Sequence, residues 1–388
     1  MKAMKSQPTE EISELLTRGV ANIIPNKDLL QKLLMGGKKL SVYLGIDPTA
    51  THIHLGHATQ LRRLQRLAEL GHHVTFLIGD FTALIGDTSD KDKERPVLTV
   101  EQVEANWQTY KSQAKKIVDF TLVEVRHNSE WLQKLGFEDT IKLARHFTLN
   151  DFISRELIKN RLTSGGSVTL PEALYPLMQG YDSYFLDTDI QLGGSDQTFN
   201  MQAGRVLQKD LRQKESFILV GSFLTGTDGR KMSKSWGNAI WLDDSAQEVF
   251  GKLMSINDNL IKEYFLLATT LPESEFPHAK NPMDSKKKLA WQVVKELFSA
   301  KDADAAQKHF ESTVQNKELP DEIVTVTVSS NSIVDVLVES GLASSKSEAR
   351  RLIEQKGVRI NQTIAGELQT VSSGDTLSVG NRKFVKIK

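Results

Sequence analysis

The chain has 388 residues, more than one ordinary domain needs, so two or three domains are expected. Its net charge is zero and it contains no cysteine, which excludes a global field that attracts nucleic acid, disulfides, thiolate zinc sites and cysteine nucleophiles. Residues 1–20 mix basic and acidic side chains, and no apolar run approaches the roughly 20 residues of a membrane helix. We therefore expect a folded cytoplasmic protein without a signal peptide or membrane anchor.

The first half of the chain alternates between helical and strand patterns. Residues 11–35 are predicted as helix, because Ile12, Leu15 and Leu16 are spaced for one face. A second helix ends near Gly71. Apolar runs predict strands at 40–46, 74–78, 122–125 and 217–220. A strand, a loop with glycine, a helix and a strand in succession indicate a parallel α/β sheet of the Rossmann-like kind.

The second half is more helical and divides into smaller parts. Residues 130–185 read as mainly helical and hold several basic side chains. Short helices at 333–342 and 345–355 precede short strands at 358–360 and 384–387. The predicted domains are an α/β domain at 1–243 with a helical insertion at about 130–185, an α-helical domain at 244–320, a linker at 321–330 and a small α+β domain at 331–388.

A histidine pair follows the first predicted parallel strand. The string is His54-Leu55-Gly56-His57, and it opens the next helix. Helix N-termini suit phosphate, glycine lets a nucleotide approach the backbone, and imidazoles can donate to phosphate oxygens. Two alternatives are open: a purely structural helix cap, and a metal site that includes His52. The metal site lacks a matching carboxylate pattern, so we expect no metal ligands here.

A basic loop lies far downstream at Lys231-Met232-Ser233-Lys234-Ser235, with glycines on both sides. Glycine at both ends favours a mobile loop, and two lysines three residues apart can surround a triphosphate. The alternative is an ordinary solvated basic loop.

A polar stripe lies on a predicted helix between these motifs. Tyr175, Gln179 and Asp182 fall at i, i+4 and i+7, which places them on one helical face. This face is either a polar outer surface or a ligand site. The glycines of the segment Gln191-Leu192-Gly193-Gly194-Ser195-Asp196-Gln197 indicate close backbone approach to a ligand.

Together, the histidine and lysine strings match the signature motifs of class I aminoacyl-tRNA synthetases. With residues 175–197 and Tyr43–Ala50, the chain resembles the bacterial-type tyrosyl-tRNA synthetases. The resemblance implies activation of L-tyrosine with ATP, accompanied by Mg²⁺, to tyrosyl-adenylate and pyrophosphate. Transfer of tyrosine to the terminal adenosine of tRNA(Tyr) follows, in a homodimer that meets through the helical insertion.

The resemblance also assigns roles to single positions. It implies catalytic roles for His54, His57, Lys231 and Lys234. The ATP-binding positions are Asp47, Thr49, His54, Gly56, His57, Gly193, Asp196, Lys231, Ser233 and Lys234. The tyrosine-binding positions are Tyr43 and Asp182 for the hydroxyl, Tyr175, Gln179 and Asp87 for the ammonium, and Gln197 for the carboxylate or the adenylate. After Asp87 this chain has Thr88-Ser89-Asp90 where many relatives have Pro-Ser-Gly, so we expect a different turn there.

The last predicted domain resembles an S4-type RNA-binding domain. Residues 331–388 hold nine Lys/Arg against six Asp/Glu, a modest basic excess. The positions implied to contact RNA phosphates are Lys346, Arg350, Arg351 and Lys356. The alternative is a solvated charged helix.

Two other functions are considered for the whole chain. A tryptophanyl-tRNA synthetase would share the fold and both motifs, but Tyr43, Asp182 and the S4-like region argue against it. A catalytically inactive synthetase-like RNA-binding protein should have damaged phosphate motifs, and both are intact here.

Overall fold

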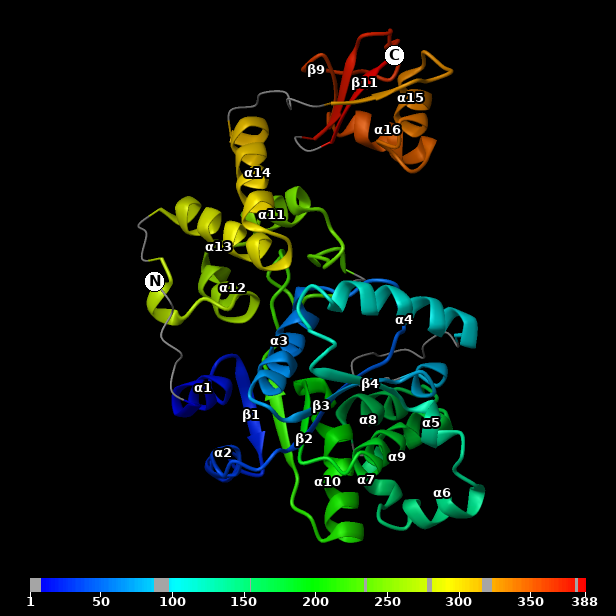
Figure 1. The fold of residues 1–388 in the computed structure, drawn as a ribbon. Helices are drawn as coiled ribbons and strands as arrows, with labels where there is room; N and C mark the ends of the chain where they lie inside the picture. Colours follow the sequence, from blue (N-terminus) through cyan, green and yellow to red (C-terminus); the bar gives the residue numbers. More distant parts are fainter. Residues whose placement is uncertain are drawn as a thin grey trace. The chain divides into compact units, whose positions relative to one another are not determined.

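The computed structural model describes residues 8–86, 98–153, 155–233, 236–277, 281–315, 323–380 and 383–388. The chain divides into two compact units, Met1–Ser299 and Ala300–Lys388 (Figure 1). The larger unit contains the predicted parallel sheet, and the smaller one contains a separate small sheet. No helix within the described ranges is long and apolar enough to span a membrane.

The large sheet has the strand order β1-β6-β5-β2-β3-β4. Its strands are β1 (Val20–Ile24), β2 (Ser41–Ile46), β3 (His73–Ile78), β4 (Val123–His127), β5 (Ile190–Gly194) and β6 (Phe217–Gly221). All neighbours are parallel except β1, which runs antiparallel to β6. The chain builds outward from β2 through β3 to β4, then crosses to β5 on the other side of β2. Ligands of open α/β sheets bind at such a switch point, beside the carboxyl ends of the strands.

The prediction of one helix over residues 11–35 was wrong. The structure has α1 (Pro8–Leu15), then β1, then α2 (Lys27–Met35). Pro25 is unfavourable inside a helix because it has no backbone N–H to donate. Asn26 then starts α2 by accepting hydrogen bonds from two backbone N–H groups. The intervening residues pair with β6, as in Ile23 opposite Leu219, a partner nearly 200 positions away that no local pattern reveals.

Helices pack around the sheet (Figure 1). They include α3 (Leu55–Glu69), α4 (Val100–Ala114), α9 (Leu170–Phe185) and α10 (Thr198–Arg212). The predicted helical insertion contains α5 (Ser129–Leu132), α6 (Phe137–Ala144), α7 (Leu149–Ile153) and α8 (Glu156–Thr163) as well as α9. Helix α9 packs along α10, and its polar stripe faces the central strand β2, where Tyr43 lies beside Asp182. The remaining helices of this unit are α11 (Ala246–Met254), α12 (Ile261–Ala268) and α13 (Pro282–Leu297), as the helical pattern predicted.

The smaller unit begins with α14 (Ala300–Phe310) and contains a sheet of order β7-β11-β10-β8-β9. Its other elements are β7 (Val324–Val326), α15 (Ile333–Glu339), α16 (Lys346–Glu354), β8 (Val358–Ile360), β9 (Thr363–Ile364), β10 (Thr376–Val379) and β11 (Lys383–Ile387). Helices α15 and α16 and strands β8 and β11 match the sequence prediction. Strand β7 lies inside the predicted linker and pairs with β11, again a contact distant in sequence.

Candidate active site

The carboxyl ends of β2, β3, β4 and β5 gather most of the predicted site residues. Tyr43 lies in β2, Asp47 follows that strand, and Tyr175, Gln179 and Asp182 all lie on α9. Tyr175 and Asp182 are buried, so the polar stripe of α9 is not an outer surface. Asp87 lies outside the described residues.

Asp182 is a buried carboxyl held by two donors. Trp131 Nε1 donates to its Oδ1 at 2.7 Å, and Asn128 Nδ2 donates to its Oδ2 at 3.2 Å. Burial raises the pKa of Asp182 to about 8, although the two hydrogen bonds oppose the shift and the charges of Asp47 and Asp80 add to it. An oriented carboxyl of this kind can share a short hydrogen bond with a ligand hydroxyl.

Tyr43 lies beside this carboxyl and is itself 2% exposed. Its hydroxyl donates to Gln191 Oε1 on β5 at 3.1 Å and also hydrogen-bonds the Gln179 side chain. Burial, reinforced by the nearby charge of Asp182, raises the pKa of Tyr43 well above its usual value. The phenol therefore stays protonated at neutral pH, and the site offers a neutral hydroxyl next to a carboxyl.

A hydrogen-bond chain runs from α9 back to Asp182. Tyr175 donates to Asp47 Oδ2 at 2.8 Å, and Thr82, in the 3₁₀ turn after β3, donates to Asp47 Oδ1 at 2.8 Å. Asn128 Nδ2 donates to Thr82 Oγ1 at 3.0 Å as well as to Asp182. Two residues predicted for different substrates, Tyr175 and Asp47, thus belong to one network.

Four members of this network were missed in the sequence: Thr82, Asn128, Trp131 and Gln191. Asn128 and Trp131 come directly after β4, and the rule that ligand residues follow parallel strands would have selected that turn. Gln191 is a fully buried amide within an apolar strand, which is the other available signal.

The two motif histidines cap α3. Gly56 N–H donates to His54 Nδ1 at 3.1 Å, and His54 N–H donates to His57 Nδ1 at 3.2 Å. A neutral imidazole that accepts at Nδ1 carries its proton at Nε2. Both rings therefore have the tautomer whose Nε2–H can donate to a phosphate oxygen. The structural and the phosphate-binding interpretations are therefore compatible.

The lysine motif lies against the histidine motif. A side-chain carbon on Gly56 would lie 2.9 Å from the His54 ring and 4.0 Å from Met232 Sδ. Lys231 Nζ lies 3.6 Å from Asp196 Oδ2, which joins this segment to the Gly-Gly-Ser-Asp-Gln turn after β5. Two of the predicted ATP-binding segments, the histidine motif and the Asp196 turn, thus flank the Lys231–Met232 segment. Lys234 lies outside the described residues.

Asn238 fixes the backbone of this loop, a role not predicted. It is 2% exposed, its Oδ1 accepts from Ser233 N–H at 2.9 Å, and its Nδ2 donates to Lys231 O at 3.1 Å. The same Nδ2 donates to Asp228 at 2.8 Å, and this hydrogen bond is the main cause that lowers the pKa of Asp228 to about 2.

The remaining predicted positions lie near these groups. Gly193 is the second-last residue of β5, where a side-chain carbon would come within 2.9 Å of Met201 Sδ, so only glycine fits without a shift. Gln197 Oε1 accepts from Asn200 Nδ2 at 3.1 Å. Thr49 N–H donates to Asp47 O at 2.8 Å and keeps that turn beside β2.

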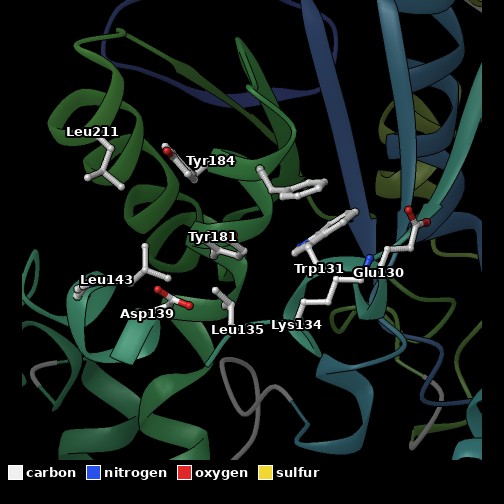
Figure 2. Close-up of a pocket in the computed structure, with 11 residues that line it drawn as sticks. Glu130, Trp131, Lys134, Leu135, Asp139, Leu143, Tyr181, Tyr184 and Leu211 are labelled. Carbon is white, nitrogen blue, oxygen red and sulfur yellow. The ribbon is translucent and has the colours of Figure 1, made fainter. Parts of the chain in front are cut away.

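Trp131 also lines a separate surface pocket of about 350 Å³ (Figure 2). Its ring stacks on Phe185 with centroids 4.5 Å apart, and Tyr181 and Tyr184 complete the aromatic wall. None of the predicted tyrosine or ATP positions that the structure describes lines this pocket. This pocket is therefore not the candidate active site, which we identify from the hydrogen-bond network around Asp182.

The four positions predicted to bind RNA lie on or just after α16 and are exposed. Lys346 pairs with Asp335 at 2.7 Å, Arg350 with Glu367 at 2.9 Å, and Arg351 is 3.8 Å from Glu348. Exposed ion pairs contribute only about 0–1 kcal/mol, so phosphates could replace these carboxylates at little cost. Lys356 follows the helix with a positive φ of 57°.

Comparison with known proteins agrees with this geometry. A family model described as tRNA synthetases class I (W and Y) matches residues 35–315, and an S4 domain model matches residues 333–377. A curated tyrosine–tRNA ligase from Dehalococcoides mccartyi is 42% identical, over 98% of this chain and 99% of its own. One from Thermotoga maritima is 42% identical, over 97% of each chain.

Solved structures show the same fold. A C-terminally truncated mitochondrial tyrosyl-tRNA synthetase from Coccidioides posadasii has a TM-score of 0.65 and 24% identity, over 77% of this chain and 91% of its own. The tyrosyl-tRNA synthetase from Archaeoglobus fulgidus, complexed with L-tyrosine, has a TM-score of 0.59 and 22% identity, over 78% of this chain and 100% of its own.

Proposed function

The chain belongs to the tyrosine–tRNA ligases of the class I synthetase family, and from this premise we propose how its residues divide the work. The reaction joins L-tyrosine to ATP as tyrosyl-adenylate, releases pyrophosphate and then esterifies tRNA(Tyr). The observation that carries the assignment of residues is the buried pair of Asp182 and Tyr43 at the switch point of the sheet.

Asp182 and Tyr43 recognise the substrate hydroxyl. Trp131 and Asn128 already donate to Asp182, so the carboxyl is oriented before tyrosine arrives. A phenylalanine in the same place would leave these buried polar groups unpaired, which is costly. Gln179 and Tyr175 line the same helix face toward the substrate ammonium, with Asp87 as the third group. Gln197 takes the carboxylate end.

His54, His57, Lys231 and Lys234 act on the ATP phosphates. The carboxylate oxygen of tyrosine attacks the α-phosphorus, and the bond to the bridging oxygen of pyrophosphate breaks. The two Nε2–H groups of the histidines donate to phosphate oxygens that gain charge in the transition state. The two lysines place positive charge on the leaving pyrophosphate. The protein forms no covalent bond and acts by positioning and electrostatics.

The remaining nucleotide contacts come from the turns around β2 and β5. Asp47 and Thr49 lie beside the nucleotide, Gly56 and Gly193 let it approach the backbone, and Asp196 accepts from the ribose. Ser233 contributes from the lysine loop. In the second half-reaction a ribose hydroxyl of the terminal tRNA adenosine attacks the adenylate carbonyl, and AMP leaves.

Mg²⁺ is proposed to enter with ATP. The described residues bring together no group of three or more histidine or acidic side chains that could hold a metal ion. We therefore assign the ion chiefly to the ATP phosphates, where it would neutralise part of their charge.

We further propose a cytoplasmic homodimer. Large apolar side chains of the helical insertion are exposed, among them Leu149, Leu162 and Leu170. An apolar surface on a helical insertion is suited to a second copy of the chain. We also propose that residues 244–320 form the anticodon-binding part and that residues 331–388 contact the tRNA through α16.

Removal of basic side chains from α16 should weaken tRNA binding only. For Lys346→Ala combined with Arg350→Ala, we expect a higher KM for tRNA(Tyr) and a plot of log KM against log salt that is shallower by about one to two units. Pyrophosphate exchange, which needs no tRNA, should not change. Lys209→Ala, which removes an exposed lysine of α10, is the control. An unchanged tRNA KM and salt slope in the double variant would reject the assignment.

ATP–pyrophosphate exchange tests the function directly, with tyrosine, phenylalanine and tryptophan offered separately. At low amino-acid concentration, exchange is expected with tyrosine alone, because only tyrosine satisfies Asp182 and Tyr43 together and phenylalanine needs a far higher concentration. Exchange with tryptophan would contradict the site assignment, and absence of exchange with all three would favour the RNA-binding alternative.

A further inference from the structure

Asp80 ties together the ends of two neighbouring parallel strands. It follows β3, and its Oδ1 accepts from Ser129 N–H at 2.9 Å. Its Oδ2 accepts from Ser129 Oγ at 2.6 Å and contacts His127 Nδ1, the last residue of β4, at 3.3 Å. One carboxylate thus fixes the residues on both sides of Asn128.

The turn held in this way supplies both donors to Asp182. Asn128 is 1% exposed, its N–H donates to Ile78 O at 2.9 Å, and its Oδ1 accepts from Phe81 N–H at 3.0 Å. Its Nδ2 is thereby aimed at Asp182. Trp131 lies on α5, a helix of one turn that starts at Ser129, so the grip of Asp80 on Ser129 also sets the place of the indole.

We propose that Asp80, paired with His127, is a positioning residue for amino-acid selection: it fixes Asn128 and Trp131 so that Asp182 faces the substrate hydroxyl. The inference rests on the proposed role of Asp182 and extends it to two residues outside the substrate contacts proposed above. It predicts that selectivity for tyrosine over phenylalanine depends on the Asp80–His127 pair at the carboxyl end of β4.

The charges around the pair support a specific role. His127 faces Asp80, Glu104 and Glu130, and its ring meets Trp107 edge-on at 5.6 Å. The hydrogen bond that the His127 ring makes to the Asp80 carboxylate raises the pKa of His127, against the opposing effect of burial. Below that pKa the imidazolium compensates the Asp80 charge, and as the pH rises through it the compensation is lost. The Asp80 charge also acts on Asp182 itself.

The test compares pyrophosphate-exchange kinetics with tyrosine and with phenylalanine. For Asp80→Ala we expect kcat/KM for tyrosine to fall by on the order of 10-fold or more, since small misplacements of a reacting or recognising group carry such losses. The loss should lie in the KM for tyrosine, with the KM for ATP unchanged. Phenylalanine, which makes no hydroxyl contact, should be activated as in the wild type, so the selectivity ratio falls by the same factor.

Asp80→Asn provides a milder variant, because its one amide oxygen can still accept from Ser129 N–H while the charge and the second acceptor are removed. We expect a smaller loss of selectivity. We also expect the pH profile of kcat/KM for tyrosine to lose the step that the titration of His127 causes. Asp210→Ala is the matched control, because it breaks another His–Asp pair of this unit, with His146 at 2.9 Å, that does not contact Asp182. Thermal melting of all variants separates loss of folding from loss of selectivity.

The outcomes distinguish a failure of the Asp80 positioning role from a failure of the proposed role of Asp182. Equal losses with both amino acids in Asp80→Ala and Asp80→Asn, or an unchanged ratio in both, would overturn the positioning role. If Asp182→Ala itself leaves the ratio unchanged, the proposed role of Asp182 fails first.

Discussion

Replacement of Asp182 by alanine is expected to lower kcat/KM for tyrosine activation by roughly 100-fold, because the buried substrate hydroxyl is then left without its partner, which costs about 1–3 kcal/mol. Activation of phenylalanine should change little. Selectivity in hydroxyl-binding sites reaches about 10⁴–10⁵, and tyrosyl-tRNA synthetase is itself the standard example of that range, so the range describes the family and is not a prediction for this chain. The measurement is pyrophosphate exchange with each amino acid.

Two further variants make the Asp182 result interpretable. Asp182→Ala leaves Trp131 Nε1–H and one N–H of the Asn128 amide without an acceptor in a buried site, which also destabilises the fold by about 1–3 kcal/mol. Tyr43→Phe removes only a hydroxyl and should give a smaller loss in the same direction. An Asp182 variant that folds and still prefers tyrosine as strongly as the wild type would show that another group reads the hydroxyl.

Replacement of His54 or His57 by alanine is expected to lower kcat for adenylate formation by roughly 10²–10³-fold each, the usual loss when one donor to a charged transition state is removed. The combined variant should lose less than the product of the two, because the rings act together on the same phosphates. Tyrosine binding, measured by equilibrium dialysis without ATP, should stay at the wild-type level. Single-turnover formation of tyrosyl-adenylate is the direct readout of the chemical step.

Asparagine variants separate the phosphate role from the cap of α3. An Asn side-chain oxygen can accept the backbone N–H that His54 Nδ1 accepts now, but it places no donor where Nε2 lies. His54→Asn should therefore melt like the wild type and still lose the activation step, whereas His54→Ala loses about 1 kcal/mol of stability as well. Full activity in His54→Asn would leave the histidine motif with a structural role alone.

Features that depend on short spacing could be predicted from the amino-acid order. The face of α9 follows from residues at i, i+4 and i+7, and the parallel strands follow from short apolar runs between helices. The histidine and lysine motifs are contiguous strings, so they are legible without a fold. The S4-like helices were likewise visible from their local periodicity.

Contacts between distant groups became visible only in the folded chain. Strand β1 and strand β7 exist because β6 and β11 offer them edges, a fact that their own residues do not carry. Asn128 and Trp131 reach Asp182 across more than 50 positions, and Asp80 reaches Ser129 across 49. A hydrogen bond between residues so far apart depends on strand order, and strand order comes from the burial of the whole sheet. For that reason the residue proposed to bind the hydroxyl could be named from the sequence, while the groups that hold it in place could not.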